Sequence, residues 1–277
     1  MKKGFANYKR KIYIVRFVVL IFFITFLAAL VFIGNGLFER GVVNLEINNF
    51  KARAVFEKED ELQGQKVTYY KVVKKYDYED VERPIYDSKK NSKIYIGSTS
   101  DIILTSRNPL RMYGNAIVRD IAGLFARYFY LGHATINISE DGSKCVECVG
   151  NQINNNGVRI VDNDWIETEV RYGNDAQTII GLRIKNTTEK QRKEICNNLE
   201  ELVGSQYNYL LIFYSRNKYY CIDLISRVLR KSNIKINYDS FYTTGNDLIV
   251  SNSTYIIFLC ERVKDGYFNI YYLSKEK

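Results

Sequence analysis

An uninterrupted apolar segment near the N-terminus constrains this chain more than any other feature. Residues 17–33 read FVVLIFFITFLAALVFI without a charge, and residues 34–38 extend the uncharged run to 22 residues. About 20 apolar residues are needed to cross a hydrocarbon core of about 30 Å. Residues 17–38 are therefore predicted to form a transmembrane anchor.

The charges that precede this segment predict its orientation. Residues 1–16 contain six Lys and Arg side chains and no acidic residue. A basic flank of this kind stays in the cytoplasm, so residues 1–16 are predicted to be a cytoplasmic tip. The rest of the chain is then extracytoplasmic on a single-pass protein of the cell membrane. The alternative is a cleaved signal peptide and a secreted domain, although the apolar run exceeds the usual h-region of about 7–15 residues.

The net charge of +9 does not indicate a nucleic-acid partner. Removing the six basic residues of the tip leaves 34 basic against 31 acidic residues. A protein that binds nucleic acid carries its basic residues as a patch or stripe on the folded domain. We therefore expect no nucleic acid among the partners.

Beyond the anchor, the pattern divides into two parts. Residues 39–92 are polar and charge-mixed, and are predicted to form a juxtamembrane stalk or a small β-rich appendage. Residues 93–277 are predicted to form an α+β domain, with a mainly antiparallel sheet flanked by helices. Strands are predicted at residues 94–96, 102–104, 134–139, 145–149, 158–161, 179–184, 255–260 and 267–273.

Three helices are predicted within this domain. Residues 116–130 carry an apolar stripe that includes Ile117, Ile121 and Leu124. We expect this helix to pack on the domain, and a lid or a membrane-docking helix is the alternative. Thr188 and Gln191 form a capping box for a helix that Gly204 ends. The third helix spans residues 220–231.

The five cysteines do not indicate a metal site. Exported proteins can form disulfides, and an odd count leaves at least one free thiol. Cys145 and Cys148 form a CxxC, but no second CxxC exists and His133 is the only histidine. A four-ligand zinc site is hard to assemble from this set. The P-loop, HExxH, GxGxxG and GxSxG motifs are also missing. No metal and no cofactor are predicted.

A cysteine nucleophile is the chemistry that the remaining residues allow. Cys221 begins a predicted helix, and a helix N-terminus favours negative charge and hence a thiolate. A histidine can pair with such a thiol and carry its proton. His133 lies at the start of one predicted strand and Glu147 midway along the next, so a hairpin places the two side by side. Without such a contact, Cys221 and His133 are ordinary structural residues.

Several short motifs, taken in order, resemble the permuted NlpC-like papain-fold cysteine hydrolases of the YiiX/YebB type. The resemblance covers about residues 94–262. The segments that carry it are Ser100–Leu104, Leu131–Ile136, Val146–Cys148, Thr188–Gln191, Gly204–Tyr209 and Tyr219–Ile225. In that family the papain order is circularly permuted, so the His strand and the acidic residue precede the Cys helix.

The resemblance implies roles for particular residues. Cys221 matches the nucleophile, His133 the base and Glu147 the polar third member. Two departures stand out: Cys-Ser-Glu-Leu-Val becomes Cys-Ile-Asp-Leu-Ile at Cys221, and Gly-Asp-Ile becomes Ser-Asp-Ile before Ile102. Neither departure removes the Cys, the His or the acid. Four residues in or beside the motifs are candidates for the substrate pocket: Tyr220, Asp223, Asp101 and Tyr207.

Three functions follow as hypotheses. The first is a cysteine hydrolase or amidase at the cell surface, with peptide or amide bonds of cell-wall material as substrate. The second is an acyltransferase or esterase that acts on lipid-linked substrates, because the fold also resembles that of lecithin–retinol acyltransferase-like enzymes. The third is a catalytically silent surface-binding module, since fold alone does not settle function. A buried Cys221, or a His133 turned away from it, would favour the third.

Overall fold

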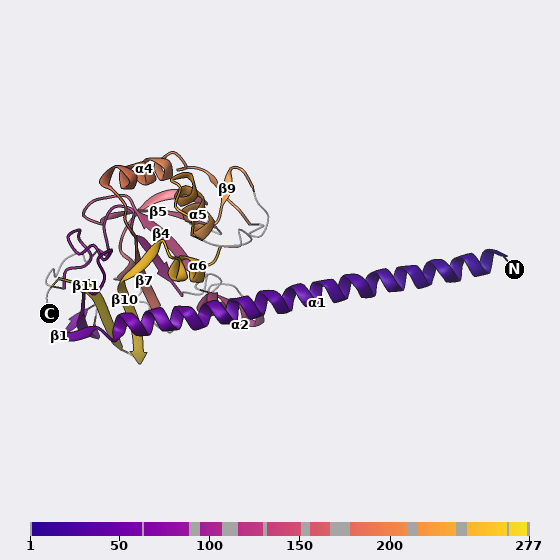
Figure 1. The fold of residues 1–277 in the computed structure, drawn as a ribbon, viewed down its shortest axis with the longest axis horizontal. Coiled ribbons are helices and arrows are strands. Elements are labelled where there is room, and N and C mark those ends of the chain that lie inside the picture. The colour runs from indigo at the N-terminus through magenta and orange to yellow at the C-terminus, as the bar shows by residue number, and fades with distance from the viewer. Residues whose placement is uncertain are drawn as a thin grey trace. The chain divides into compact units, whose positions relative to one another are not determined.

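The computed structural model describes residues 2–62, 64–88, 95–106, 116–129, 132–150, 156–166, 178–209, 215–236, 243–264 and 266–275. The chain divides into two compact units, Met1–Gly41 and Val42–Lys277. The second unit is a mixed α+β fold built on one large sheet (Figure 1).

Helix α1 (Lys2–Lys51) is a single helix of 50 residues. It contains one stretch that is long and apolar enough to cross a membrane, with a mean hydropathy of 3.0. The helix continues beyond the predicted end of the anchor at Phe38. Its last turns are helical because Val43, Ile47 and Phe50 recur at helical spacing and pack against the core of the second unit.

The sheet of the second unit has nine strands in the order β1-β2-β11-β10-β7-β3-β4-β5-β6. All neighbours are antiparallel except β2 and β11, which run parallel. The strands are β1 (Ala54–Leu62), β2 (Gln65–Val73), β3 (Ile102–Thr105), β4 (His133–Asn137), β5 (Lys144–Val149), β6 (Gly157–Asp162), β7 (Thr178–Ile184), β10 (Thr254–Lys264) and β11 (Tyr267–Ser274). A separate two-stranded ladder joins β8 (Gln206–Tyr207) and β9 (Lys218–Tyr219).

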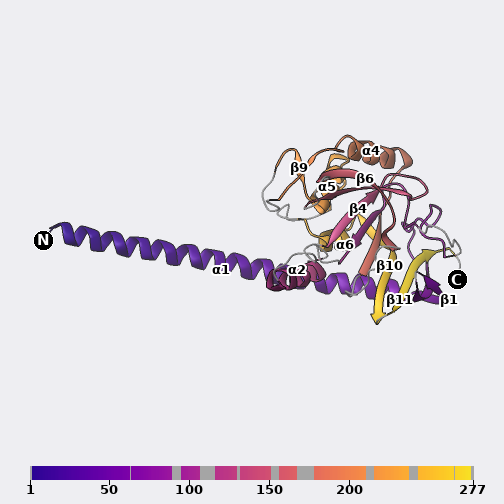
Figure 2. The same cartoon turned by 180° about the vertical axis from the view of Figure 1, so that it is seen from behind.

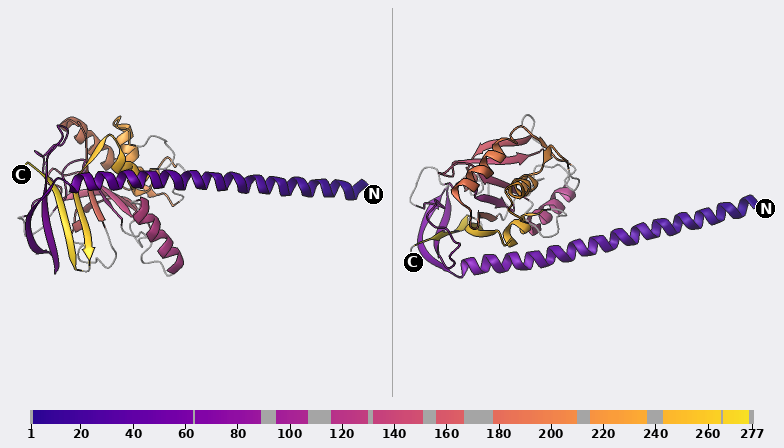
Figure 3. Two further views of the ribbon diagram at one scale, coloured as in Figure 1. Left: turned by 60° about the horizontal axis from the view of Figure 1, so that its bottom comes forward. Right: turned by 45° about the horizontal axis from the view of Figure 1, so that its top comes forward.

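Strands β1 and β2 belong to this sheet, whereas the sequence pattern separated residues 39–92 from the domain. The two strands form a hairpin, and β2 pairs in parallel with β11 at the other end of the chain. The rings of Tyr70 and Tyr271 stack across this pair with centroids 4.7 Å apart. Residues 42–88 are therefore part of the second unit, and they contain two strands (Figure 3).

The helices of the second unit largely follow the predicted pattern. Within the described residues they include α2 (Ala116–Phe129), α4 (Glu189–Glu200), α5 (Cys221–Lys231) and α6 (Gly245–Val250). The predicted capping box is present, because the Thr188 hydroxyl accepts from the amide of Gln191 and the Gln191 side chain accepts from the amide of Thr188. The short helix α6 was not predicted. Figure 2 shows α4 and α5 along the same end of the sheet.

One predicted strand is wrong in the part that the structure describes. Residues 94–96 read as a strand, but Ile94 lies outside the described residues and Tyr95 and Ile96 are not in a strand. Ile96 is fully buried. The apolar pattern there reflects burial in the core and not pairing with another strand.

Candidate active site

Three adjacent strands place His133, Glu147 and Arg159 in one row. Thr135 lies opposite Glu147 in the β4–β5 register, so His133, two residues away on the same face, is a diagonal neighbour of Glu147. Glu147 lies directly opposite Arg159 on β6. The Nε2 atom of His133 is 2.7 Å from Oε2 of Glu147. Arg159 donates from Nε to Oε1 of the same carboxylate over 2.7 Å.

Helix α5 brings Cys221 to this row. The helix packs against β4 and β5 through buried apolar side chains that include Ile222 and Ile225. Cys221 is its first residue, and the N-cap residue Tyr220 forms no side-chain hydrogen bond to the first turn. Cys221 therefore lies at the end of α5 where the unpaired backbone amides give the helix its partial positive charge.

The thiol of Cys221 is hydrogen-bonded to His133. Since Nε2 of the imidazole is engaged with Glu147, the nitrogen that can exchange a proton with the thiol is Nδ1. His133 and Glu147 have 19% and 9% of their side chains exposed, and Cys221 is also partly exposed. The three predicted site residues thus lie in one hydrogen-bonded chain that reaches the surface.

The chain of contacts determines where the proton of His133 resides. Burial disfavours the charged imidazole, but the hydrogen bonds with Cys221 and Glu147 outweigh it and raise the pKa of His133 to about 10. Burial likewise opposes charge on Glu147, yet the hydrogen bonds from His133 and Arg159 keep its pKa below the usual value. At neutral pH the site therefore holds an imidazolium between a carboxylate and the sulfur of Cys221.

The other four cysteines differ from Cys221. All four are buried, and none of them forms a disulfide with a described residue. Burial raises the pKa of the Cys145 thiol to about 12 and that of Cys196 to about 11, and it also raises the pKa of Cys148. The thiol of Cys148 donates to the carbonyl of Tyr219 over 3.0 Å. Cys145 and Cys148 are therefore structural residues in the described part of the chain, and at neutral pH they are thiols.

Two residues support His133 that the sequence pattern did not single out. Arg159 fixes the carboxylate of Glu147 with a second contact of 2.6 Å from its terminal nitrogen. Trp165, the only tryptophan, stacks on the imidazole with ring centroids 5.4 Å apart and an interplanar angle of 25°. Arg159 could have been identified from its position on the strand that follows Glu147. No local sequence pattern identifies Trp165.

Three of the candidate pocket residues lie close to Cys221 in the chain or in space. Tyr220 is buried, and its hydroxyl donates to the carbonyl of Thr243 over 3.2 Å. Asp223 accepts from Arg227 over 2.7 Å, and its second carboxylate oxygen is buried without a hydrogen bond. Burial raises the pKa of Asp223. The ring of Tyr207 packs against Gly150, just after β5.

Asp101 has a structural position instead. Its side chain is 1% exposed and pairs with the fully buried Arg183 at 2.6 Å. Arg183 also donates to the backbone carbonyls of Asp80 and Pro84. Asp101 therefore joins the 80–84 segment to the core and does not line a substrate pocket.

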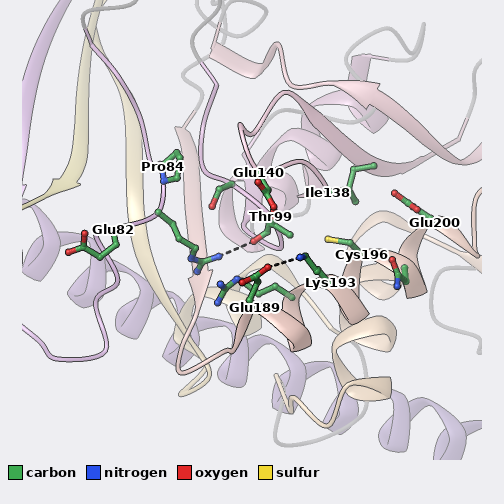
Figure 4. Close-up of a pocket in the computed structure, with 13 residues that line it drawn as sticks. Glu82, Pro84, Thr99, Ile138, Glu140, Glu189, Lys193, Cys196 and Glu200 are labelled. Carbon is green, nitrogen blue, oxygen red and sulfur yellow. Dashed lines mark hydrogen bonds and ion pairs between the residues drawn. The ribbon is translucent and has the colours of Figure 1, made fainter.

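A cavity of about 410 Å³ lies beside α4, away from the site residues (Figure 4). Figure 4 shows Lys193 paired with Glu189 among the residues that line the cavity. Its lining carries charges of both signs and includes neither Cys221 nor His133. Among the described residues, no group of three or more His, Cys, Asp and Glu side chains is placed to hold a metal ion.

Comparison with known proteins adds little. No protein-family model matches the sequence, and no curated protein matches it. Among solved structures, the chain is similar to one described as the crystal structure of metalloprotein yiiX from Escherichia coli O157:H7, DUF1105. The match covers 58% of this chain and 96% of that chain, with 10% sequence identity and a TM-score of 0.39. At that TM-score the similarity supports no conclusion about function.

Proposed function

We propose that this protein is a membrane-anchored cysteine hydrolase of circularly permuted papain-like fold that cleaves amide or peptide bonds in cell-wall material. One observation carries the proposal: Cys221, the first residue of α5, is hydrogen-bonded to His133, which Glu147 holds from the other side. Both His133 and Glu147 precede the Cys helix in the chain, as the permuted order requires. The apolar stretch of α1 anchors the chain, and the basic tip before it keeps the domain outside the cytoplasm.

In the proposed reaction, Cys221, His133 and Glu147 each have a role in forming the thioester and again in hydrolysing it. The thiolate of Cys221 attacks the amide carbon, and the backbone N–H of Cys221 stabilises the negative oxygen that results. The imidazolium of His133 gives its proton to the leaving amine as the C–N bond breaks. The neutral imidazole then takes a proton from water, which attacks the thioester and releases the thiolate. Glu147 keeps the ring oriented throughout.

Two features argue against a catalytically silent binding module. Such a module would favour a buried Cys221 or a His133 turned away from it. Cys221 is partly exposed, and it is the cysteine that contacts the imidazole. The carboxylate of Glu147 is also held by two partners, an arrangement that orients a histidine and contributes nothing to a hydrophobic core.

A lipid-directed acyltransferase or esterase is the second candidate. The observation in its favour is the apolar face of α2, which is exposed at Ile117, Ile121 and Leu124. Helix α2 ends at Phe129, four residues before His133. An exposed apolar surface on the helix that precedes the His133 strand suits an acyl chain better than a peptide.

Selective alkylation tests the proposed nucleophile. Full-length protein in detergent is treated with iodoacetamide at pH 7, and the labelled cysteines are identified by mass spectrometry. An ordinary thiol is only a few per cent thiolate at this pH. We expect Cys221 to react, while the four buried cysteines stay unlabelled. In His133→Ala the rate at Cys221 should fall by about tenfold, because the imidazole that can take up the proton of the thiol is gone.

This control is unusually direct, because no other histidine in the chain can replace His133. Trp165→Phe is the matched variant, since it changes a ring that contacts the imidazole and leaves the proton carrier in place. Equal rates at Cys221 in native protein and in His133→Ala would remove the basis for a cysteine hydrolase.

A further inference from the structure

Helix α2 presents three bulky apolar side chains to the outside. Ile117, Ile121 and Leu124 are 72%, 50% and 61% exposed, and their i, i+4, i+7 spacing aligns them on one face. The buried residues of α2 include Gly123, Ala126 and Phe129. A surface helix ordinarily turns branched apolar side chains such as the other three toward the core.

This arrangement calls for an apolar partner. Burial of apolar surface is worth about 25 cal/mol per Å², and a contiguous exposed apolar patch marks an interaction site on a soluble domain. Three branched side chains on one exposed helix face form such a patch. Figure 3 shows α2, the magenta helix, at the periphery of the second unit, where a large flat partner can reach it.

The length of chain between anchor and domain identifies the partner. The predicted span ends at Phe38 and the second unit begins at Val42, and the chain stays helical between them. At a rise of about 1.5 Å per residue these few residues give no long, flexible linker. A lipid surface is therefore always within reach of the domain.

We propose that the Ile117–Ile121–Leu124 face of α2 inserts into the surface of the membrane that α1 spans. One edge of the face fits this position, since the side chain of Asp120 is 74% exposed and can stay among the headgroups. The proposal rests on the anchor in the proposed function and is independent of the chemistry of Cys221.

Docking of α2 has a consequence for the site. The carbonyl of Tyr128 in the last turn of α2 accepts from Asn246, and the chain then leads directly to His133. Docking would hold the end of α2, which leads to His133, at the lipid surface. The docked protein would therefore favour substrates presented at that surface, which are lipid-linked amides or esters.

Photocrosslinking in a defined bilayer tests the docking. The full chain is reconstituted into nanodiscs of phosphatidylethanolamine and phosphatidylglycerol, with p-benzoylphenylalanine in place of Ile121. Matched proteins carry the probe in place of Leu27 in the predicted span, or of Glu194, which is exposed on α4. We expect lipid adducts at positions 27 and 121 and none at 194. Leu124→Asp should abolish the adducts at position 121, because a carboxylate on the face keeps it out of the hydrocarbon.

Any of the following outcomes would contradict the docking of α2. Lipid adducts at position 27 together with none at 121, or with links from 121 to a second copy of the chain, would leave the anchor in place and refute docking of α2. Adducts at 194 equal to those at 121 would show contact without insertion of a particular face. A lack of adducts at position 27 would refute the anchor, and the docking with it.

Discussion

Cys221→Ala is expected to reduce the hydrolysis of peptidoglycan fragments by at least about 10³-fold, to the background rate. Removal of the nucleophile from a nucleophile–histidine–carboxylate set costs about as much as removal of the whole set, because the three act as a unit. The structure gives the physical reason. His133 and Glu147 act through the sulfur of Cys221, so neither can promote the attack on the substrate once that sulfur is gone. The measurement is the release of new amino groups by full-length protein in detergent.

Cys196→Ala is the matched control for this prediction. It makes the same change at a buried cysteine of α4, on the cavity away from the site, and should leave the rate unchanged. Full activity in Cys221→Ala would contradict the proposed mechanism. If the fragments are not cleaved but a lipid ester is, and that cleavage requires Cys221, the second candidate function replaces the first.

Asp101→Ala is expected to destabilise the second unit by about 3–5 kcal/mol, the usual effect of removing one partner of a buried ion pair. The guanidinium of Arg183 is fully buried, and without Asp101 it keeps only backbone and hydroxyl acceptors for its charge. Urea unfolding followed by the fluorescence of Trp165, the only tryptophan, measures the loss. Asp101→Asn keeps the shape of the side chain and provides a milder variant if Asp101→Ala does not fold.

Glu189→Gln serves as the comparison, because it breaks an exposed ion pair with Lys193 on α4. Exposed pairs contribute little, so its unfolding midpoint should match that of the native protein. A midpoint for Asp101→Ala equal to the native one would contradict the structural role of Asp101 and reopen its candidacy as a pocket residue.

Much of the sheet and of the site could be predicted because the signals are local. The short apolar segments of β4 and β5, the capping box at Thr188 and the apolar spacing of α5 each depend on neighbouring residues. Antiparallel pairing of consecutive strands then brings Glu147 near His133 without further information.

What could not be predicted depends on contacts between distant parts of the chain. The parallel pairing of β2 with β11 joins residues about 200 positions apart, and no pattern in residues 39–92 indicates it. The partner of Asp101, Arg183, lies 82 positions away, so a motif position alone did not separate an ion pair from a substrate pocket. The outward apolar face of α2 has the same spacing as an inward one, because periodicity shows that a face is apolar but not what covers it.

The central claim is that Cys221, His133 and Glu147 share a proton. The titration of His133 tests this claim most directly. Full-length protein labelled with ¹³C-histidine shows one imidazole signal, because the chain has one histidine. The native signal should remain that of an imidazolium until the pH approaches about 10. Cys221→Ser and Glu147→Gln should each lower that midpoint, because each removes a group that holds the proton. A native midpoint near the ordinary histidine value of about 6.5, unchanged by Cys221→Ser, would contradict the proposed site.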